Sequence, residues 1–178
     1  MLARDLLKEE ILKKAVVHSK VILSSGKEAD YYVDLRRVTL DSTAAPLVGD
    51  VMLDLVKDWE FDAVGGLTLG ADPVATAMMH IAAHKGKKID SFVVRKAEKA
   101  HGLQRRIEGP DVQGKRVVAV EDTSTTGGSV LTAVEALREA GAIVVGVAVI
   151  VERGAKGKVT EAGLEYRAIF LLNELFQK

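Results

Sequence analysis

Val117-Val118-Ala119-Val120-Glu121-Asp122-Thr123-Ser124-Thr125-Thr126-Gly127-Gly128-Ser129 is the stretch of sequence that decides the fold. It begins as an apolar strand, Arg116–Glu121, and continues into a loop of hydroxyl residues and glycines before a helix near Ser129. Runs rich in valine and isoleucine that are apolar on both sides predict strands buried on both faces of a parallel sheet. Further runs of this kind are Asp62–Leu67, Ser91–Val94, Ile143–Val151 and, more weakly, Arg167–Leu172.

Helical patterns separate these strands. The two clearest are Asp72–Lys85 and Ser129–Ala140, and the second ends at Gly141 as a helix C-cap would. Strands that alternate with helices in this way predict right-handed crossovers and an α/β fold: a three-layer, Rossmann-like parallel sheet.

The first sixty residues follow another pattern. We expect a helix, a hairpin-like pair of strands and a long helix with Pro46 in its first turn. Their expected ranges are Leu2–Ser19, Val21–Ser24 with Tyr31–Leu35, and Thr43–Val56. Since no linker interrupts the chain, we predict one domain over residues 1–178. About residues 1–40 form a small N-terminal subdomain, and about 43–172 form the α/β core.

Composition narrows the possible functions. The 25 lysines and arginines balance 25 acids, so no global basic field favours nucleic acid as a partner. The absence of cysteine excludes disulfides, thiolate metal sites and a cysteine nucleophile. No apolar run is long enough for a membrane span, and the N-terminus lacks a signal peptide's apolar stretch. We therefore expect a cytoplasmic protein without a membrane partner.

The opening stretch also predicts a binding site. Ligands bind beyond the carboxyl ends of strands in open α/β sheets, and amides at a helix N-terminus favour phosphate. Carboxylates beside a phosphate would repel it, so Glu121 and Asp122 must face another part of the ligand, and a sugar diol suits them. A ribose 5-phosphate site follows; the simpler alternative is a polar turn with a helix N-cap. The candidate residues are Glu121, Asp122, Thr123, Ser124, Thr125, Thr126, Gly127, Gly128 and Ser129.

This stretch resembles the phosphoribosyl pyrophosphate (PRPP) signature of type I phosphoribosyltransferases. Three more segments are similar to orotate phosphoribosyltransferases in particular, and together they cover roughly residues 20 to 155. They are the Arg-Lys-x-x-Lys-x-His-Gly run Arg95–Gly102, the substrate hood Val21–Lys27 with Tyr31–Asp34, and the pyrophosphate loop within Gly65–Pro73. Ser24 and Gly70 stand where many members of the family carry lysine, and Lys27 is the candidate to replace the first.

The resemblance implies the type I phosphoribosyltransferase fold with an N-terminal hood. It also implies transfer of the phosphoribosyl group from PRPP to orotate, which gives orotidine 5′-monophosphate and pyrophosphate in pyrimidine biosynthesis. Magnesium is the implied cofactor, held mainly by PRPP and without direct protein ligands. The implied assembly is a homodimer in which a mobile catalytic loop, residues 96–113, acts on the neighbouring subunit's active site; its sequence lacks sustained periodicity.

Each implied role falls on particular residues. The catalytic candidates are Lys99, His101 and Asp122, with His101 or a lysine as proton donor to pyrophosphate. Further PRPP contacts are expected at Lys27, Arg95 and Lys96, and backbone amides before a helix predict a pyrophosphate loop at Thr68, Leu69, Gly70 and Ala71. Thr125 and Arg153 are expected to contact orotate, whose carboxylate an arginine can bind bidentately.

Two alternatives remain open at this point. A purine-base phosphoribosyltransferase would not need the anion clamp expected of Arg153. A non-catalytic regulator that senses PRPP would share the fold, but it would be expected to show a basic face for nucleic acid.

Overall fold

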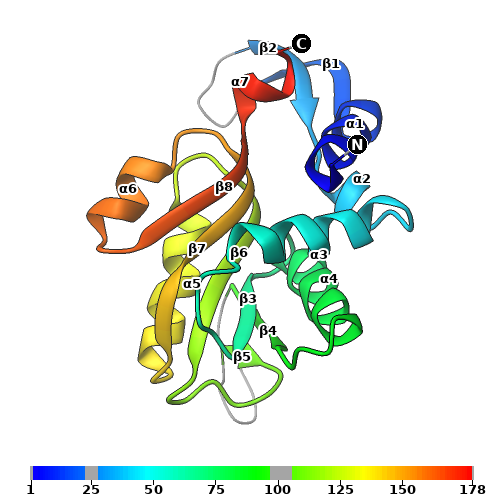
Figure 1. Cartoon of the computed structure of the whole chain (residues 1–178). Coiled ribbons are helices and arrows are strands. Elements are labelled where there is room, and N and C mark those ends of the chain that lie inside the picture. The colour runs from blue at the N-terminus through cyan, green and yellow to red at the C-terminus, as the bar shows by residue number, and fades with distance from the viewer. Residues whose placement is uncertain (1, 23–27, 97–105, 178) are drawn as a thin grey trace.

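The computed structural model describes residues 2–22, 28–96 and 106–177. Within these residues the main sheet has six strands in the order β5-β4-β3-β6-β7-β8 (Figure 1). All its neighbouring strands pair in parallel except β5, which is antiparallel to β4. The strands are β3 (Ala63–Leu67), β4 (Asp90–Val94), β5 (Ile107–Glu108), β6 (Arg116–Ser124), β7 (Ile143–Glu152) and β8 (Glu165–Leu171).

Helices cover both faces of this sheet and make three layers (Figure 1). One face packs against α1 (Ala3–Lys14), α3 (Ala44–Leu55) and α4 (Ala71–His84). The other packs against α5 (Gly128–Glu139) and α6 (Lys156–Glu161). Successive residues of β6 alternate between the two cores, with Val118 in the first and Val117 in the second. The predicted three-layer α/β fold with a mainly parallel sheet is therefore confirmed.

The N-terminal residues form a two-stranded antiparallel sheet of β1 (Val16–Ile22) and β2 (Glu28–Val33), followed by α2 (Arg36–Thr39). The C-terminal helix α7 (Leu172–Leu175) lies beside them (Figure 1). Contact is direct, since the rings of Tyr31 and Phe176 have centroids 4.9 Å apart. Both chain ends thus meet at the end of the main sheet where its parallel strands terminate.

Some sequence-based boundaries were wrong. The first helix, expected to reach Ser19, ends at Lys14, because β-branched Val16 and Val17 begin a strand that pairs with β2. Strand β6 extends through Ser124, so the predicted loop begins later, where β6 stops pairing with β7.

The segment 96–113 was expected to lack secondary structure. Its residues Ile107 and Glu108 instead form β5 and pair with Val94 and Val93. The backbone N–H of Arg95 donates to the carbonyl of Arg106 at 2.7 Å, so the residues on either side of 97–105 lie side by side. In the part of the chain that the structure describes, no helix is long and apolar enough to cross a membrane.

Candidate active site

A cavity of about 310 Å³ lies at the carboxyl ends of the parallel strands. Four segments of the chain contribute to it: the end of β2 with the start of α2, the β3–α4 turn with the neighbouring Lys96, the β6–α5 loop, and the residue after β7. This is the position at which open parallel sheets bind ligands. The lining residues are Tyr32, Val33, Asp34, Leu35, Arg36, Leu67, Thr68, Leu69, Gly70, Lys96, Glu121, Asp122, Thr123, Thr125, Ser129 and Arg153.

Two adjacent carboxyl groups form one wall of the cavity. Glu121 is only 6% exposed, and burial together with the charge of Asp122 raises its pKa to about 8. Burial raises the pKa of Asp122 as well, although hydrogen bonds and the positive charge of Arg36 oppose that shift. The backbone N–H of Thr123 donates to Asp122 Oδ1 at 2.6 Å and fixes that carboxyl group. This pair offers oxygen acceptors that are already turned toward a ligand.

The β6–α5 loop presents a helix N-terminus to the same cavity. Gly127 precedes α5 with φ of +75°, a left-handed conformation in which a side chain would be strained. Ser129, in the first turn of α5, lines the cavity. Free N–H groups at the start of a helix attract anions, so this loop is suited to phosphate.

The β3–α4 turn lies opposite the acids. Thr68 Oγ1 donates to Asp72 Oδ2 at 2.7 Å, the Thr68–Leu69 peptide is cis, and α4 begins at Ala71. A Cβ added at Gly70 would lie 2.2 Å from Glu121 Oε1 and 2.8 Å from Asp122 Oδ1. The backbone of this turn is therefore in close contact with the acid pair, and the two form one continuous surface.

Among the residues that the structure describes, three cationic ones line the cavity: Lys96, Arg153 and Arg36. Lys96 is exposed, whereas the Nε of Arg153 is buried and has no hydrogen-bond partner within that part of the chain. Arg36 donates from Nε to Asp34 Oδ1 at 2.8 Å, which raises the pKa of the guanidinium. An anionic ligand would therefore meet positive charge from three separate segments.

The structure brings together many of the sequence-predicted residues. Those that line the cavity are Thr68, Leu69, Gly70, Lys96, Glu121, Asp122, Thr123, Thr125, Ser129 and Arg153. Those outside its lining are Ala71, Arg95, Ser124, Thr126, Gly127 and Gly128. Lys27, Lys99 and His101 lie outside the described residues.

Two of the residues outside the lining have other partners. Arg95 forms an ion pair with Glu108 of β5 at 3.3 Å. Ser124 is buried and hydrogen-bonds Tyr166. The side chains of Arg95 and Ser124 therefore do not line the cavity at the strand ends.

Sequence reasoning missed the contribution of Tyr32, Asp34 and Arg36. The run Tyr31–Asp34 was noticed as part of a hood, but no role was assigned to its side chains. The sequence does contain a signal for these residues: Asp34 and Arg36 lie at the end of a predicted strand, as Glu121 and Asp122 do.

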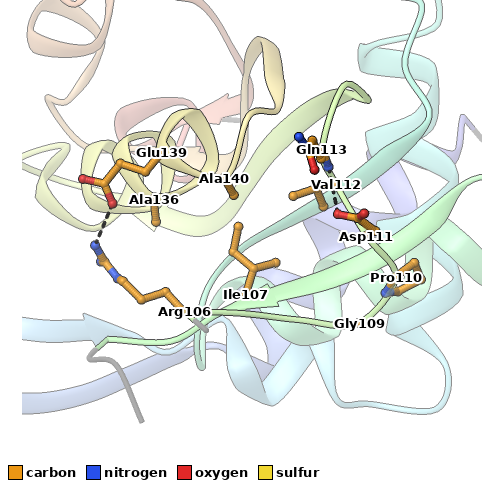
Figure 2. Close-up of a pocket in the computed structure, with 10 residues that line it drawn as sticks. All are labelled: Arg106, Ile107, Gly109, Pro110, Asp111, Val112, Gln113, Ala136, Glu139 and Ala140. Carbon is orange, nitrogen blue, oxygen red and sulfur yellow. Dashed lines mark hydrogen bonds and ion pairs between the residues drawn. The ribbon is translucent and has the colours of Figure 1, made fainter. Parts of the chain in front are cut away.

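Another cavity, of about 390 Å³, lies between the 106–113 segment and the C-terminal end of α5 (Figure 2). Figure 2 shows Arg106 reaching toward Glu139, from which its Nη1 is 3.9 Å away. None of the predicted PRPP or orotate contacts that lie within the described residues lines this cavity. The candidate site is therefore the cavity at the strand ends.

Comparison with known proteins gives the family. Residues 42–166 match the family described as phosphoribosyl transferase domain. An orotate phosphoribosyltransferase of Streptomyces avermitilis is 67% identical over 175 residues, which cover 97% of this chain and 96% of that protein. The chain belongs to the orotate phosphoribosyltransferase family. A member of this family from Corynebacterium glutamicum is 58% identical over 97% of this chain and 94% of that protein.

Solved structures agree with this assignment to the orotate phosphoribosyltransferase family. Mycobacterium tuberculosis orotate phosphoribosyltransferase in complex with Fe(III) dicitrate has a TM-score of 0.90 and 54% identity, with 99% of this chain and 100% of that chain covered. The same protein in complex with PRPP has a TM-score of 0.86 and 49% identity, with the same coverage. The predicted type I phosphoribosyltransferase fold is thereby confirmed, and the chain is an enzyme of the pentosyltransferase class.

Proposed function

We propose that this chain transfers the 5-phosphoribosyl group of PRPP to orotate, giving orotidine 5′-monophosphate and pyrophosphate. The observation that carries the proposal is the single cavity in which an acid pair, a helix N-terminus and three cationic residues meet. A ligand with a diol, a phosphate and a further anionic group matches each of these features. Membership of the orotate phosphoribosyltransferase family supports orotate as the accepting base.

The ribose 5-phosphate would occupy the β6–α5 side of the cavity. Asp122 and Glu121 would accept hydrogen bonds from the ribose diol and lie near the positive charge that develops on the sugar. The stretch Thr123–Ser129 would hold the 5-phosphate with backbone N–H groups and with the hydroxyls of Thr123, Thr125 and Ser129, which line the cavity.

Pyrophosphate would leave toward the β3–α4 turn. The backbone of Thr68–Ala71 at the start of α4 would face its oxygens, and Lys96 lies on the same cavity. Arg95, Lys27, Lys99 and His101 are proposed to join them. Their cationic groups would stabilise the charge that grows on the leaving group, with His101 or a lysine as proton donor.

Orotate would bind beside Arg153 and Thr125. The buried Nε of Arg153 has no hydrogen-bond partner among the described residues, which suits a guanidinium that binds a carboxylate of the ligand. Arg36 is a further cation on the cavity and would add to the field that attracts both anionic substrates.

Magnesium is the proposed cofactor. The carboxyl groups of Glu121 and Asp122 line the cavity and would lie near an ion that is held mainly by PRPP oxygens, without caging it. Bound in this way, magnesium would neutralise charge on the pyrophosphate. The protein's own residues would orient the ribose and exclude water, which otherwise hydrolyses PRPP.

A cytoplasmic homodimer is the proposed working form, with the 96–113 loop reaching the partner's active site. An apolar groove of about 480 Å³ supports an interface, because it runs from α2 to α4 and shares Leu69 with the active-site turn. Leu40 and Leu69 on this groove are 68% and 56% exposed, so they extend its apolar surface, and contiguous exposed apolar surface is typical of protein interfaces.

The test is direct. Purified protein is mixed with Mg²⁺, PRPP and orotate, and the loss of orotate's ultraviolet absorbance is followed. Turnover that requires PRPP supports the proposal. Turnover with a purine base but not with orotate would overturn it. No turnover with any base, despite measurable PRPP binding, would favour a PRPP-sensing regulator.

A further inference from the structure

Glu152 is a buried carboxyl group at the end of β7, directly before Arg153. Only 7% of the residue is exposed. Its Oε1 accepts hydrogen bonds from the backbone N–H of Gly154 at 2.8 Å and of Lys156 at 3.1 Å. One side chain therefore fixes the backbone of the turn that carries Arg153.

The second oxygen of Glu152 has a side-chain partner. Tyr166 of β8 donates its hydroxyl to Oε2, and Ser124 at the end of β6 hydrogen-bonds the same hydroxyl. All three side chains are buried. Burial and the bond to Glu152 raise the pKa of the Tyr166 phenol above its usual range, so the hydroxyl stays protonated and remains a donor.

This network joins two segments of the proposed substrate site. The backbone N–H of Arg153 donates to the carbonyl of Ser124 at 2.9 Å. Gly154 has φ of +127°, and a Cβ added there would lie 3.3 Å from the carbonyl oxygen of Thr125. The Arg153 turn and the β6–α5 loop are thus in contact, and a shift of one would move the other.

Stability alone does not account for a carboxylate in this place. Burying a charge is costly, and apolar residues of similar volume are often at least as stabilising. The donors to Glu152 are a hydroxyl and two backbone N–H groups, none of which carries a charge. These three hydrogen bonds fix the conformation of the turn, because each one restrains a different part of it.

We propose that Glu152 and Tyr166 are positioning residues that hold the Arg153 guanidinium at the orotate carboxylate. The proposal rests on the function proposed above for Arg153. A guanidinium binds a carboxylate bidentately only when its plane is correctly oriented. A turn that no longer fixes Arg153 would therefore weaken the binding of orotate more than the binding of PRPP.

The test is a double-mutant cycle of Tyr166→Phe and Arg153→Ala, with KM measured separately for orotate and PRPP. Arg153→Ala should raise the KM for orotate by about 10- to 100-fold, as expected for the loss of a charge-assisted pair. Tyr166→Phe should raise it by about 3- to 10-fold, with kcat and the KM for PRPP within about 2-fold. In the double variant, Tyr166→Phe should add almost nothing, because the group that it positions is absent.

Thr160→Val is the matched control, since it removes an exposed hydroxyl of α6 that bonds only the carbonyls of Lys156 and Gly157. Melting temperatures establish that each variant is folded. If Tyr166→Phe folds poorly, Glu152→Gln, which keeps an acceptor for the two N–H groups, takes its place in the cycle.

The outcomes separate the two proposals. An unchanged orotate KM in Arg153→Ala overturns the orotate contact itself. If Arg153→Ala raises the KM for orotate, and Tyr166→Phe then raises it further by the same factor as in the wild type, the positioning role is overturned. The contact between Arg153 and orotate would still be supported. Preference for orotate over uracil, which lacks the carboxylate, should fall in Tyr166→Phe; an unchanged preference would also refute positioning.

Discussion

Glu121→Gln should make the free protein more stable at alkaline pH while it weakens PRPP binding. The folded-state pKa of Glu121 is about 8, against an ordinary value of 4.5. The folded protein therefore retains a proton that the unfolded chain releases, and stability falls as pH rises from 4.5 to 8. At about 1.4 kcal/mol for each pH unit, this loss amounts to about 5 kcal/mol across the window. Glutamine does not titrate, and it keeps an acceptor for the N–H of Asp122 that now donates to Oε1.

The assay is the melting temperature of wild type and variant between pH 5 and pH 9. About 4 kcal/mol of this loss falls between pH 5 and pH 8, and for a domain of this size 1 kcal/mol shifts Tm by roughly 2–4 °C, so the variant's advantage should widen by up to roughly 8–16 °C. Glu135→Gln, an exposed change on α5, controls for the loss of one carboxylate and should give a constant offset. Saturating Mg²⁺ and PRPP should stabilise the wild type more than the Glu121 variant. Parallel pH profiles for wild type and Glu121→Gln would refute the reasoning, since they would mean that Glu121 ionises normally in the folded protein.

Three further predictions concern other parts of the site. Asp122→Asn should weaken PRPP binding by about 10- to 100-fold in calorimetry, because a charged acceptor of the diol is lost, and an unchanged Kd would exclude that role. Lys99→Ala should lower kcat by orders of magnitude at nearly constant Tm, because its charge is proposed to serve only the leaving group; a normal rate would reject it. Gly127→Ala should cost about 1–2 kcal/mol because of its positive φ and a Val159 methyl 3.3 Å from the added Cβ. Gly157→Ala, which meets open space in α6, should leave Tm unchanged or slightly higher, and equal effects of the two glycine changes would contradict this explanation.

The sequence predicted best the features that repeat along the chain. Strands of the sheet interior are apolar on both faces, so β3, β6 and β7 could be located from composition alone. The place of Glu121 and Asp122 followed from topology, because the end of a parallel strand is where a ligand binds. Gly127 was expected just before a helix, because the helical pattern Ser129–Ala140 follows it.

Features set by contacts between distant segments could not be predicted. Whether Val16 and Val17 continue a helix or start a strand depends on pairing with β2. Ser124 was expected in a loop that contacts phosphate, but the buried hydroxyl of Tyr166 holds it in the sheet. Glu152 directly follows the predicted strand Ile143–Val151, and its proposed role depends on three donors from other positions of the chain.

Glycine at position 70 brings the backbone of the β3–α4 turn close to the acid pair. A side chain there would have to displace the carboxyl groups of Glu121 and Asp122 from their present positions. Another segment brings positive charge to these acids. Arg36 supplies it from the start of α2, since it lines the same cavity and its charge opposes the rise in the pKa of Asp122 that burial causes. Asp34 Oδ1 accepts two hydrogen bonds from Arg36, one from the guanidinium Nε and one from the backbone N–H, so the N-terminal segment takes part in the electrostatics of the site as well as covering it.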